Sequence, residues 1–418
     1  MIYDLIIIGA GAAGLFAGAS LPHPVNGLII EKKAAPGRKL LLSGSGQCNL
    51  THGGSIKDFI SHYGENGSRI RPILYQFNNR SVVDLFENRG IPLLEREDGK
   101  IFPKSLKAQD ILEVLTSCCR ENNLRFLFSS PVDRITRSGP VYTVTCCDRS
   151  YQAAKLIIAT GGCSYPATGS DGSFFSVLRE LGIEIVPPAP ALVPLYPSQY
   201  PYQELSGISF RQVEAAVRPS SGKFHRNRDD LLLTHTCFSG PVILNLSRYA
   251  RPGDILTINY YPFKPGEAII RELTERISGN KKQLITVLQE YFSSGANGAP
   301  SELPRRFLEV LCRRAGADAE GKASTTSITT LKALIRLLSN DEFKIARLGG
   351  YESAMVTSGG AALSEINTKT MEALKFPNLY FAGEVLDVDG DTGGYNLQFA
   401  FSSGKLAAQS AAASNSNP

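Results

Sequence analysis

The first glycine-rich turn limits the fold of this chain more than any other feature of its sequence. Gly9, Gly11 and Gly14 follow the apolar segment Tyr3–Ile8 and open an Ala/Gly/Leu-rich segment that ends near Leu21. In a strand–turn–helix unit with this spacing, the first glycine permits the tight turn. The second lets a pyrophosphate approach the backbone, and the third lets the helix pack closely on the strand. The pattern predicts a dinucleotide-binding β-α-β unit.

The second strand of this unit supports the same interpretation. The apolar segment Gly27–Ile30 ends at Glu31, roughly 20 residues after the turn, where an acidic side chain hydrogen-bonds an adenosine ribose. The free N–H groups at the start of the first helix also favour a bound phosphate. The alternative is a purely structural glycine turn. We predict cofactor contacts from six residues: Gly9, Gly11, Ala12, Ala13, Gly14 and Glu31.

Composition excludes several classes of protein. The formal charge is +5 and no dense Lys/Arg run occurs, so we expect no nucleic-acid partner. The eight cysteines include no C-x-x-C pair, which predicts reduced thiols in a cytoplasmic protein rather than a disulfide framework or zinc ribbon. The apolar start carries Asp4 and is interrupted by glycines, so we expect neither an export signal nor a membrane span. We expect no metal site, and monomer and homodimer both remain open.

Patterning along the chain predicts an interrupted first domain. A cluster of prolines between Pro187 and Pro201 marks a domain edge, short strands follow as far as Tyr261, and Pro265–Leu338 has helical periodicity. We predict an α/β fold, a three-layer FAD domain of the two-dinucleotide-binding type with an inserted small β-barrel and a helical subdomain. The expected parts are residues 1–188 and 346–418 for the FAD domain, 189–262 for the barrel with a closing strand near 341–348, and 263–340 for the helical subdomain.

The C-terminal segments distinguish FAD from NAD as the cofactor. The apolar strand near Leu379–Ala382 leads into Gly383 and Glu384, similar to the late strand of flavoproteins, where an acid meets the ribityl chain. Asp391–Gln398 then opens a helix whose N-terminus can face the flavin N1–C2=O edge, where negative charge develops on reduction. The alternative is a glycine-rich loop that caps an ordinary C-terminal helix.

Four motifs together resemble one family. They are Gly37–Thr51, Thr160–Pro166 with Gly169, His235 with Ser239-Gly240-Pro241, and Gly383–Gly390. Their text and order are similar to the bacterial FAD-binding flavoprotein family that includes aminoacetone oxidases and the bile-acid 3-dehydro-Δ4,6-reductases. The resemblance covers essentially the whole chain and implies non-covalent FAD with an inserted substrate-side domain. Gln47 departs from the family, which usually has Arg there.

The resemblance extends the set of expected cofactor-binding residues. It implies contacts from the first half of the chain through Lys32, Arg38, Lys39, Ser43, Gly44, Asn49, Val132, Thr160, Gly161 and Gly162. From the C-terminal part it implies Gly383, Glu384, Asp389, Gly393, Gly394, Tyr395, Asn396 and Leu397.

Few side chains suit acid–base or nucleophilic chemistry. His235 is the candidate catalytic acid or base, because an imidazole exchanges protons near neutral pH, although a structural histidine is the alternative. Cys48 is a candidate thiol beside the flavin, yet cysteine more often acts as a small buried hydrophobe.

We therefore expect an FAD-dependent oxidoreductase that transfers hydride between flavin N5 and a small organic substrate, either an amine or a CH–CH/enone compound. Only one dinucleotide-binding motif occurs, so NAD(P)H as reductant would have to dock over the flavin itself. An NAD(P)H-dependent flavin reductase with a shared site is one alternative, and a flavin-loaded redox sensor or scaffold is another. Oxidase and reductase remain open.

The first prediction concerns the cofactor. Denaturing the purified yellow protein should release FAD rather than FMN, because the Gly9–Gly14 turn and Glu31 recognise the adenosine half. Gly11→Val should yield mostly apoprotein, since a branched side chain blocks the pyrophosphate. Chromatography of the released flavin and the ratio of flavin to protein absorbance measure both effects. Release of FMN alone would contradict the prediction.

Overall fold

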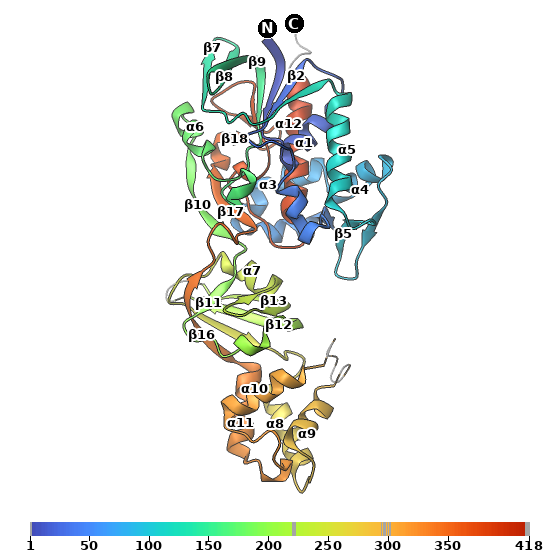
Figure 1. Cartoon of the computed structure of the whole chain (residues 1–418), viewed down its shortest axis with the longest axis vertical. Coiled ribbons are helices and arrows are strands. Elements are labelled where there is room, and N and C mark those ends of the chain that lie inside the picture. Colours follow the sequence, from blue (N-terminus) through green and yellow to red (C-terminus); the bar gives the residue numbers. More distant parts are fainter. Residues whose placement is uncertain are drawn as a thin grey trace. The chain divides into compact units, whose positions relative to one another are not determined.

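The computed structural model describes residues 2–219, 223–293, 295, 298, 300 and 302–413. The chain forms two compact units, one of residues 1–191 with 351–418 and one of residues 192–350 (Figure 1). The sequence placed these boundaries at 188/189 and near 346. No helix in the part of the chain that the structure describes is long and apolar enough to cross a membrane.

A mixed sheet forms the centre of the first unit. Its strands follow the order β18-β19-β20-β9-β1-β2-β6, and the β7–β8 hairpin pairs with β9. The short apolar strand Gly27–Ile30 (β2) is buried throughout, and Ile2–Ile8 (β1) is buried from Leu5 to Ile8, as strands covered on both faces require. The other strands are Leu124–Leu127 (β6), Arg134–Ser138 (β7), Val141–Cys146 (β8), Arg149–Ile158 (β9), Ile366–Asn367 (β18), Glu372–Ala373 (β19) and Leu379–Phe381 (β20).

Helices cover this sheet, and α1, α5 and α12 lie together beside it (Figure 1). They span Ala12–Ala19 (α1), Ala108–Glu121 (α5) and Tyr395–Ala413 (α12). Smaller elements complete the unit: Ile56–Phe59 (α2), Gly67–Gln76 (α3), Asn79–Asn88 (α4), Phe174–Leu181 (α6), and the sheet of Thr51–His52 (β3), Leu93–Glu95 (β4) and Lys100–Pro103 (β5). The α/β fold class predicted from the sequence is confirmed.

The proline-rich segment differs from the sequence expectation. Pro187, Pro188 and Pro190 lie inside the strand Ile185–Ala191 (β10), which pairs antiparallel with Val356–Ala361 (β17). These two strands form a two-stranded sheet with a register shift between Val186 and Ala189. Edge strands and bulges tolerate proline, because the backbone N–H that proline lacks is not needed there for a hydrogen bond to a neighbouring strand. The proline cluster therefore contains a strand that the sequence analysis did not predict.

The second unit is a closed antiparallel barrel with helices attached. Its strands run in the order β11-β14-β13-β12-β15-β16. They span Leu195–Pro197 (β11), Ser209–Arg218 (β12), His225–Leu233 (β13), Phe238–Ser239 (β14), Ile255–Asn259 (β15) and Asp341–Leu348 (β16). The helices span Pro241–Ser247 (α7), Gly266–Ile277 (α8), Leu284–Tyr291 (α9), Arg305–Ala315 (α10) and Ile328–Ser339 (α11).

A buried ion pair joins the barrel to its helices. Arg314 on α10 contacts both carboxylate oxygens of Asp341 at 2.7 Å, and the hydroxyl of Tyr202 also donates to Asp341. Asp341 is only 1% exposed. The pKa of Arg314 is raised because the hydrogen bond and charge of Asp341 outweigh burial. A buried carboxylate needs such pairing, so this contact holds α10 on the strand β16.

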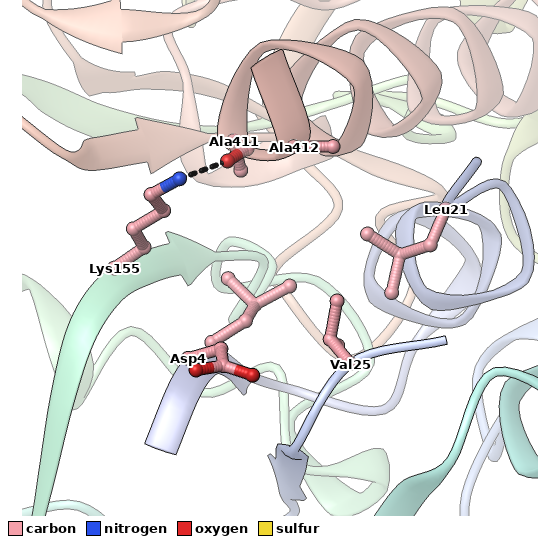
Figure 2. A pocket seen from close by; sticks show the side chains of 7 residues that line it. Asp4, Leu21, Val25, Lys155, Ala411 and Ala412 are labelled. Carbon is pink, nitrogen blue, oxygen red and sulfur yellow. Dashed lines mark hydrogen bonds between the residues drawn. The ribbon is translucent and has the colours of Figure 1, made fainter. Parts of the chain in front are cut away.

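A buried lysine anchors the end of the C-terminal helix in the first unit. The Lys155 ammonium, on β9, donates to the carbonyl oxygen of Ala411 in the last turn of α12, beside Asp4, Leu21 and Val25 (Figure 2). A cation there also opposes the negative end of the helix dipole. Burial lowers the pKa of Lys155, although the charges of Asp4 and Glu372 act in the other direction.

This lowered pKa predicts a pH dependence of stability. Below its ordinary value of 10.5, Lys155 binds fewer protons in the folded than in the unfolded chain, so its contribution to stability increases as pH rises toward that value. The free energy of unfolding of wild type minus that of Lys155→Met should therefore grow between about pH 8 and about pH 10. Urea denaturation measures it, with the exposed Lys332→Met as control. A flat or falling difference contradicts the prediction.

Candidate functional site

Parallel pairing brings four sequence motifs to one edge of the sheet. β20 pairs parallel with β9, β9 with β1, and β1 with β2, so their carboxyl ends lie side by side. Directly beyond these ends lie Gly9 after β1, Glu31 after β2, Thr160 after β9 and Gly383 after β20. In open α/β sheets, ligands bind outside the carboxyl ends of the strands. This edge is therefore the candidate site.

The three glycines of the first turn have different surroundings. A Cβ on Gly9 would lie 2.4 Å from the Ala159 carbonyl oxygen, and one on Gly14 would lie 2.0 Å from the Gly9 carbonyl oxygen. A Cβ on Gly11 would meet no atom within 4 Å. Gly9 and Gly14 are thus required by the fold itself, whereas Gly11 keeps open a space at the start of α1. A pyrophosphate on the helix N-terminus fits that space.

Glu31 is fixed in orientation by backbone groups. Its Oε2 accepts from Ala10 N and its Oε1 from Lys33 N, both at 2.8 Å. These bonds hold the carboxylate beside the glycine turn, and each oxygen keeps lone pairs for further donors. The geometry suits a carboxylate that accepts from ribose hydroxyls.

Two hydroxyl groups after β9 lack internal partners. Thr160 Oγ1 and Ser170 Oγ are buried, and neither has a hydrogen-bond partner among the residues that the structure describes. A Cβ on Gly161 would lie 3.0 Å from Ser170 Oγ, so the two hydroxyls flank the Thr160-Gly161-Gly162 turn. Buried hydroxyls are normally hydrogen-bonded. Their state fits a site that a polar group completes.

A charged network joins the two ends of the chain at the same edge. Lys39 Nζ donates to Glu384 Oε2 at 2.5 Å and also to the hydroxyl of Ser164. Glu384 Oε1 accepts from Ser164 Oγ at 2.5 Å and from Thr357 N at 2.9 Å. The side chains of Lys39 and Glu384 are 26% and 19% exposed. The network holds a carboxylate after β20 while leaving it accessible to a ligand.

The loop 37–51 packs against the start of α12. A Cβ on Gly394 would lie 2.5 Å from the backbone of Thr51, and the Asn49 amide oxygen accepts from Gly394 N at 3.1 Å. Asn396 closes its own loop, accepting from Gly390 N at 2.7 Å and donating to Gly390 O at 2.9 Å. From the sequence, Asn396 was expected to contact the cofactor. In the structure its amide braces the loop that precedes the helix.

The other expected residues fall into three groups. Lys32 pairs with Asp171 at 2.5 Å and Ser43 Oγ donates to Leu40 O at 2.7 Å, so both have internal partners. Arg38 is exposed and Val132 is half-buried. The remaining expected residues lie in the glycine turn or the first turn of α1, the Thr160 turn, the loop 37–51, the segment that leads into α12, or the start of α12: Ala12, Ala13, Gly44, Gly162, Asp389, Gly393, Tyr395 and Leu397.

Sequence reasoning missed several residues of this edge. Thr357 Oγ1 accepts from Cys163 N at 2.7 Å and from Ser164 N at 3.1 Å, and Thr357 precedes the pair Gly359-Gly360. Two adjacent glycines inside a strand were the available signal, because they mark a close backbone approach. Nothing comparable marks His62, which stacks on Tyr395 with ring centroids 4.0 Å apart.

The Gln47 position retains a neighbouring positive charge. Arg96 donates to Gln47 Oε1 at 2.6 Å, and its guanidinium carbon lies 4.0 Å from the ring centroid of Phe102. The resemblance had suggested a lost arginine there, yet Arg96 from a distant part of the sequence supplies a guanidinium beside it.

The two candidate reactive residues differ in accessibility. Cys48 is fully buried, and burial raises the pKa of its thiol to about 12, so it is protonated near neutral pH. His235 is exposed in the turn between β13 and β14 of the second unit. Within the described ranges, no group of three or more His, Cys, Asp or Glu side chains could hold a metal ion.

The chain is similar to known proteins over nearly its whole length. The family described as "HI0933-like protein Rossmann domain" matches residues 3–410. The chain is 31% identical over 416 residues to "Ribosomal RNA dihydrouridine synthase" of Escherichia coli (strain K12), covering 99% of both chains. It is 27% identical over 413 residues to "3-dehydro-bile acid delta(4,6)-reductase" of Clostridium scindens, covering 97% of this chain and 98% of the relative.

Solved structures share the fold at low identity. A 3-ketosteroid-Δ4-(5α)-dehydrogenase from Rhodococcus jostii RHA1 matches with a TM-score of 0.52 and 14% identity, covering 98% of this chain and 96% of that one. A flavocytochrome c3 fumarate reductase matches with a TM-score of 0.51 and 15% identity, covering 100% and 79%.

The charged network predicts an energetic coupling between the two ends of the chain. In a double-mutant cycle of Lys39→Met and Glu384→Gln, the coupling free energy should reach about 1 kcal/mol, because the pair is largely shielded from water and shares Ser164. The exposed pair Arg89–Glu121 should give a clearly smaller coupling, because water screens it. Denaturant unfolding of the FAD-free forms measures both. Equal coupling in the two cycles would refute the network.

Proposed function

Because the chain belongs to the HI0933-like protein family and is an FAD-dependent oxidoreductase, we propose that it reduces uridine in ribosomal RNA to dihydrouridine. The reaction adds two hydrogens across the C5=C6 bond of uracil, which is conjugated to the C4 carbonyl. Of the enone, amine and sensor roles that the sequence left open, we therefore propose the enone role.

The names of the relatives support a single type of chemistry. A dihydrouridine synthase and a 3-oxo Δ4,6 reductase both saturate a carbon–carbon double bond conjugated to a carbonyl. The substrates differ greatly in size and charge, while the polarised double bond is common to both. Because the chain is similar to both relatives over nearly its full length, saturation of a conjugated double bond is the reaction that its relatives support best.

The distribution of charge is the observation that favours RNA over a steroid. Residues 192–350 hold 21 of the 44 Lys and Arg residues but only 15 of the 39 Asp and Glu residues, a net charge of +6. The remaining residues carry the other 23 and 24, a net charge of −1. The excess of +5 therefore belongs to one unit. Concentrated basic charge is the electrostatic footprint of a nucleic-acid-binding unit.

The chain has no dense Lys/Arg run, and for that reason we expected no nucleic-acid partner. The basic residues of the second unit are instead spread over strands and helices that fold together. A steroid acid carries one negative charge and would need no such excess.

The site residues have separate tasks in this proposal. The space at Gly11 and the carboxylate of Glu31 would hold the adenosine diphosphate half of FAD, and Thr160 would donate to it. Glu384, held by Lys39, would accept from the ribityl hydroxyls, and the start of α12 would present its partial positive charge to the pyrimidine ring.

When bound, FAD would carry one hydride, that is two electrons and one proton, from a reduced nicotinamide to the substrate. Reduction of uracil also needs a proton at C5. His235 remains our proposal for that donor, since it is exposed and an imidazole exchanges protons near neutral pH.

Turnover under anaerobic conditions tests the proposal. After reduction with NADH or NADPH, the protein should be reoxidised by ribosomal RNA transcribed in vitro, and mass spectrometry of the digested RNA should detect dihydrouridine. A 3-oxo-Δ4 steroid acid and aminoacetone test the alternative substrate classes, with Gly11→Val as the flavin-poor control. Reoxidation by the steroid or turnover of the amine, without dihydrouridine in the RNA, would contradict the proposed function and support the alternative substrate.

A further inference from the structure

Two neighbouring barrel strands present a strip of arginine and phenylalanine. Val213, Ala215 and Val217 of β12 are buried in the barrel, so the alternate residues of this strand face outward. Ala216 and Glu214 pair directly with Arg226 and Arg228 of β13. Directly opposed residues share a face of an antiparallel pair. Arg226 and Arg228 are therefore on the outer face of the barrel, together with Arg218.

Aromatic rings accompany these arginines. The Arg226 guanidinium carbon lies 5.5 Å from the ring centroid of Phe224, and that of Arg228 lies 4.9 Å from the ring centroid of Phe263. Phe224 is 46% exposed, a large fraction for a phenylalanine. We call Arg218, Phe224, Arg226, Arg228 and Phe263 the arginine strip.

Carboxylates on β12 and β16 neutralise only part of this charge. Glu214 contacts Arg226 at 3.3 Å and Glu342 contacts Arg218 at 3.8 Å. The side chains of Arg226 and Arg218 remain 60% and 59% exposed. Exposed pairs of this kind are weak and exchange readily for a stronger anion such as phosphate. Asp229 and Asp230 also lie on β13, while Lys344 on β16 adds a further exposed cation.

We propose that the arginine strip binds the RNA substrate, its guanidinium groups contacting phosphates and Phe224 stacking on an unpaired base. The proposal rests on the proposed function and adds the surface that recognises the polynucleotide. Single-stranded nucleic acid is bound where cations follow the backbone and aromatic rings offer stacking platforms. An exposed phenylalanine between arginines combines both features, and a steroid or amine substrate would use neither.

Binding of a fluorescein-labelled oligouridylate of about 20 nucleotides tests the strip by fluorescence anisotropy. The triple variant Arg218→Gln/Arg226→Gln/Arg228→Gln should raise Kd about tenfold or more. Between about 50 and about 200 mM salt, its slope of log affinity against log salt should be smaller by about 2, since each phosphate contact in single strands contributes about 0.7. Phe224→Ala should weaken binding about fivefold with little change of slope, because stacking releases no counterions.

A matched control lies in the first unit. Arg125 is exposed and its guanidinium carbon lies 5.5 Å from the ring centroid of Tyr3, at the edge of the sheet opposite the strands' carboxyl ends. Arg125→Gln should leave Kd unchanged. Glu214→Gln, which removes a carboxylate from the strip's face, should tighten binding about twofold and remains informative if the triple variant fails to fold. FAD content and melting temperature verify that each variant is folded.

Strip and function can fail separately. Dihydrouridine formation by the wild type, with RNA binding unaffected in the triple variant and in Glu214→Gln, would overturn the strip and leave the proposed function. Weakened binding in the strip variants, with no dihydrouridine formed in any RNA, would support the strip and overturn the function. A wild type that does not bind the oligouridylate, or an equal loss in Arg125→Gln, would also overturn the strip.

Discussion

The close approach of the first and last helices to each other and to the central sheet is the constraint on which this structure depends. A Cβ on Gly404 of α12 would lie 2.6 Å from the Ala13 carbonyl oxygen of α1, and a Cβ on Gly383 would lie 2.6 Å from Ala13 Cβ. Backbone therefore meets backbone at this point. The candidate site exists only because residues nearly 400 positions apart pack at this distance.

This packing also explains the polar arrangement at the sheet edge. With β20 beside β9, Glu384 comes within reach of Lys39 and Ser164, and the strand that returns from the second unit brings Thr357 to the same carboxylate. Each of these residues comes from a different segment of the chain. The insertion of residues 192–350 thus interrupts the first unit without separating the parts of its site. Charge is divided accordingly, with the basic excess confined to the inserted unit.

Local patterns made much of the fold predictable. Gly9, Gly14 and Glu31 indicated a dinucleotide-binding unit, because turn geometry and strand length are short-range properties that the residues themselves impose. The family resemblance pointed to FAD and to the inserted barrel. Proline misled in one place, since β10 accommodates Pro187 and Pro188 through pairing with β17, a contact across about 170 residues.

The sequence alone determined the cofactor class, the fold class and the glycine turn at which we propose that the dinucleotide binds, since these follow from local backbone geometry and a characteristic order of motifs. Only the tertiary structure decided which side chains act together. Asn396 proved to brace its own loop, Arg96 to stand beside Gln47, and Thr357 to hold Glu384. The arginine strip likewise depends on strand register. Arg218 and Arg226 form no recognisable motif in the sequence, and they share a face only because β12 and β13 pair. Side-chain partnership depends on long-range packing, which no local sequence pattern encodes.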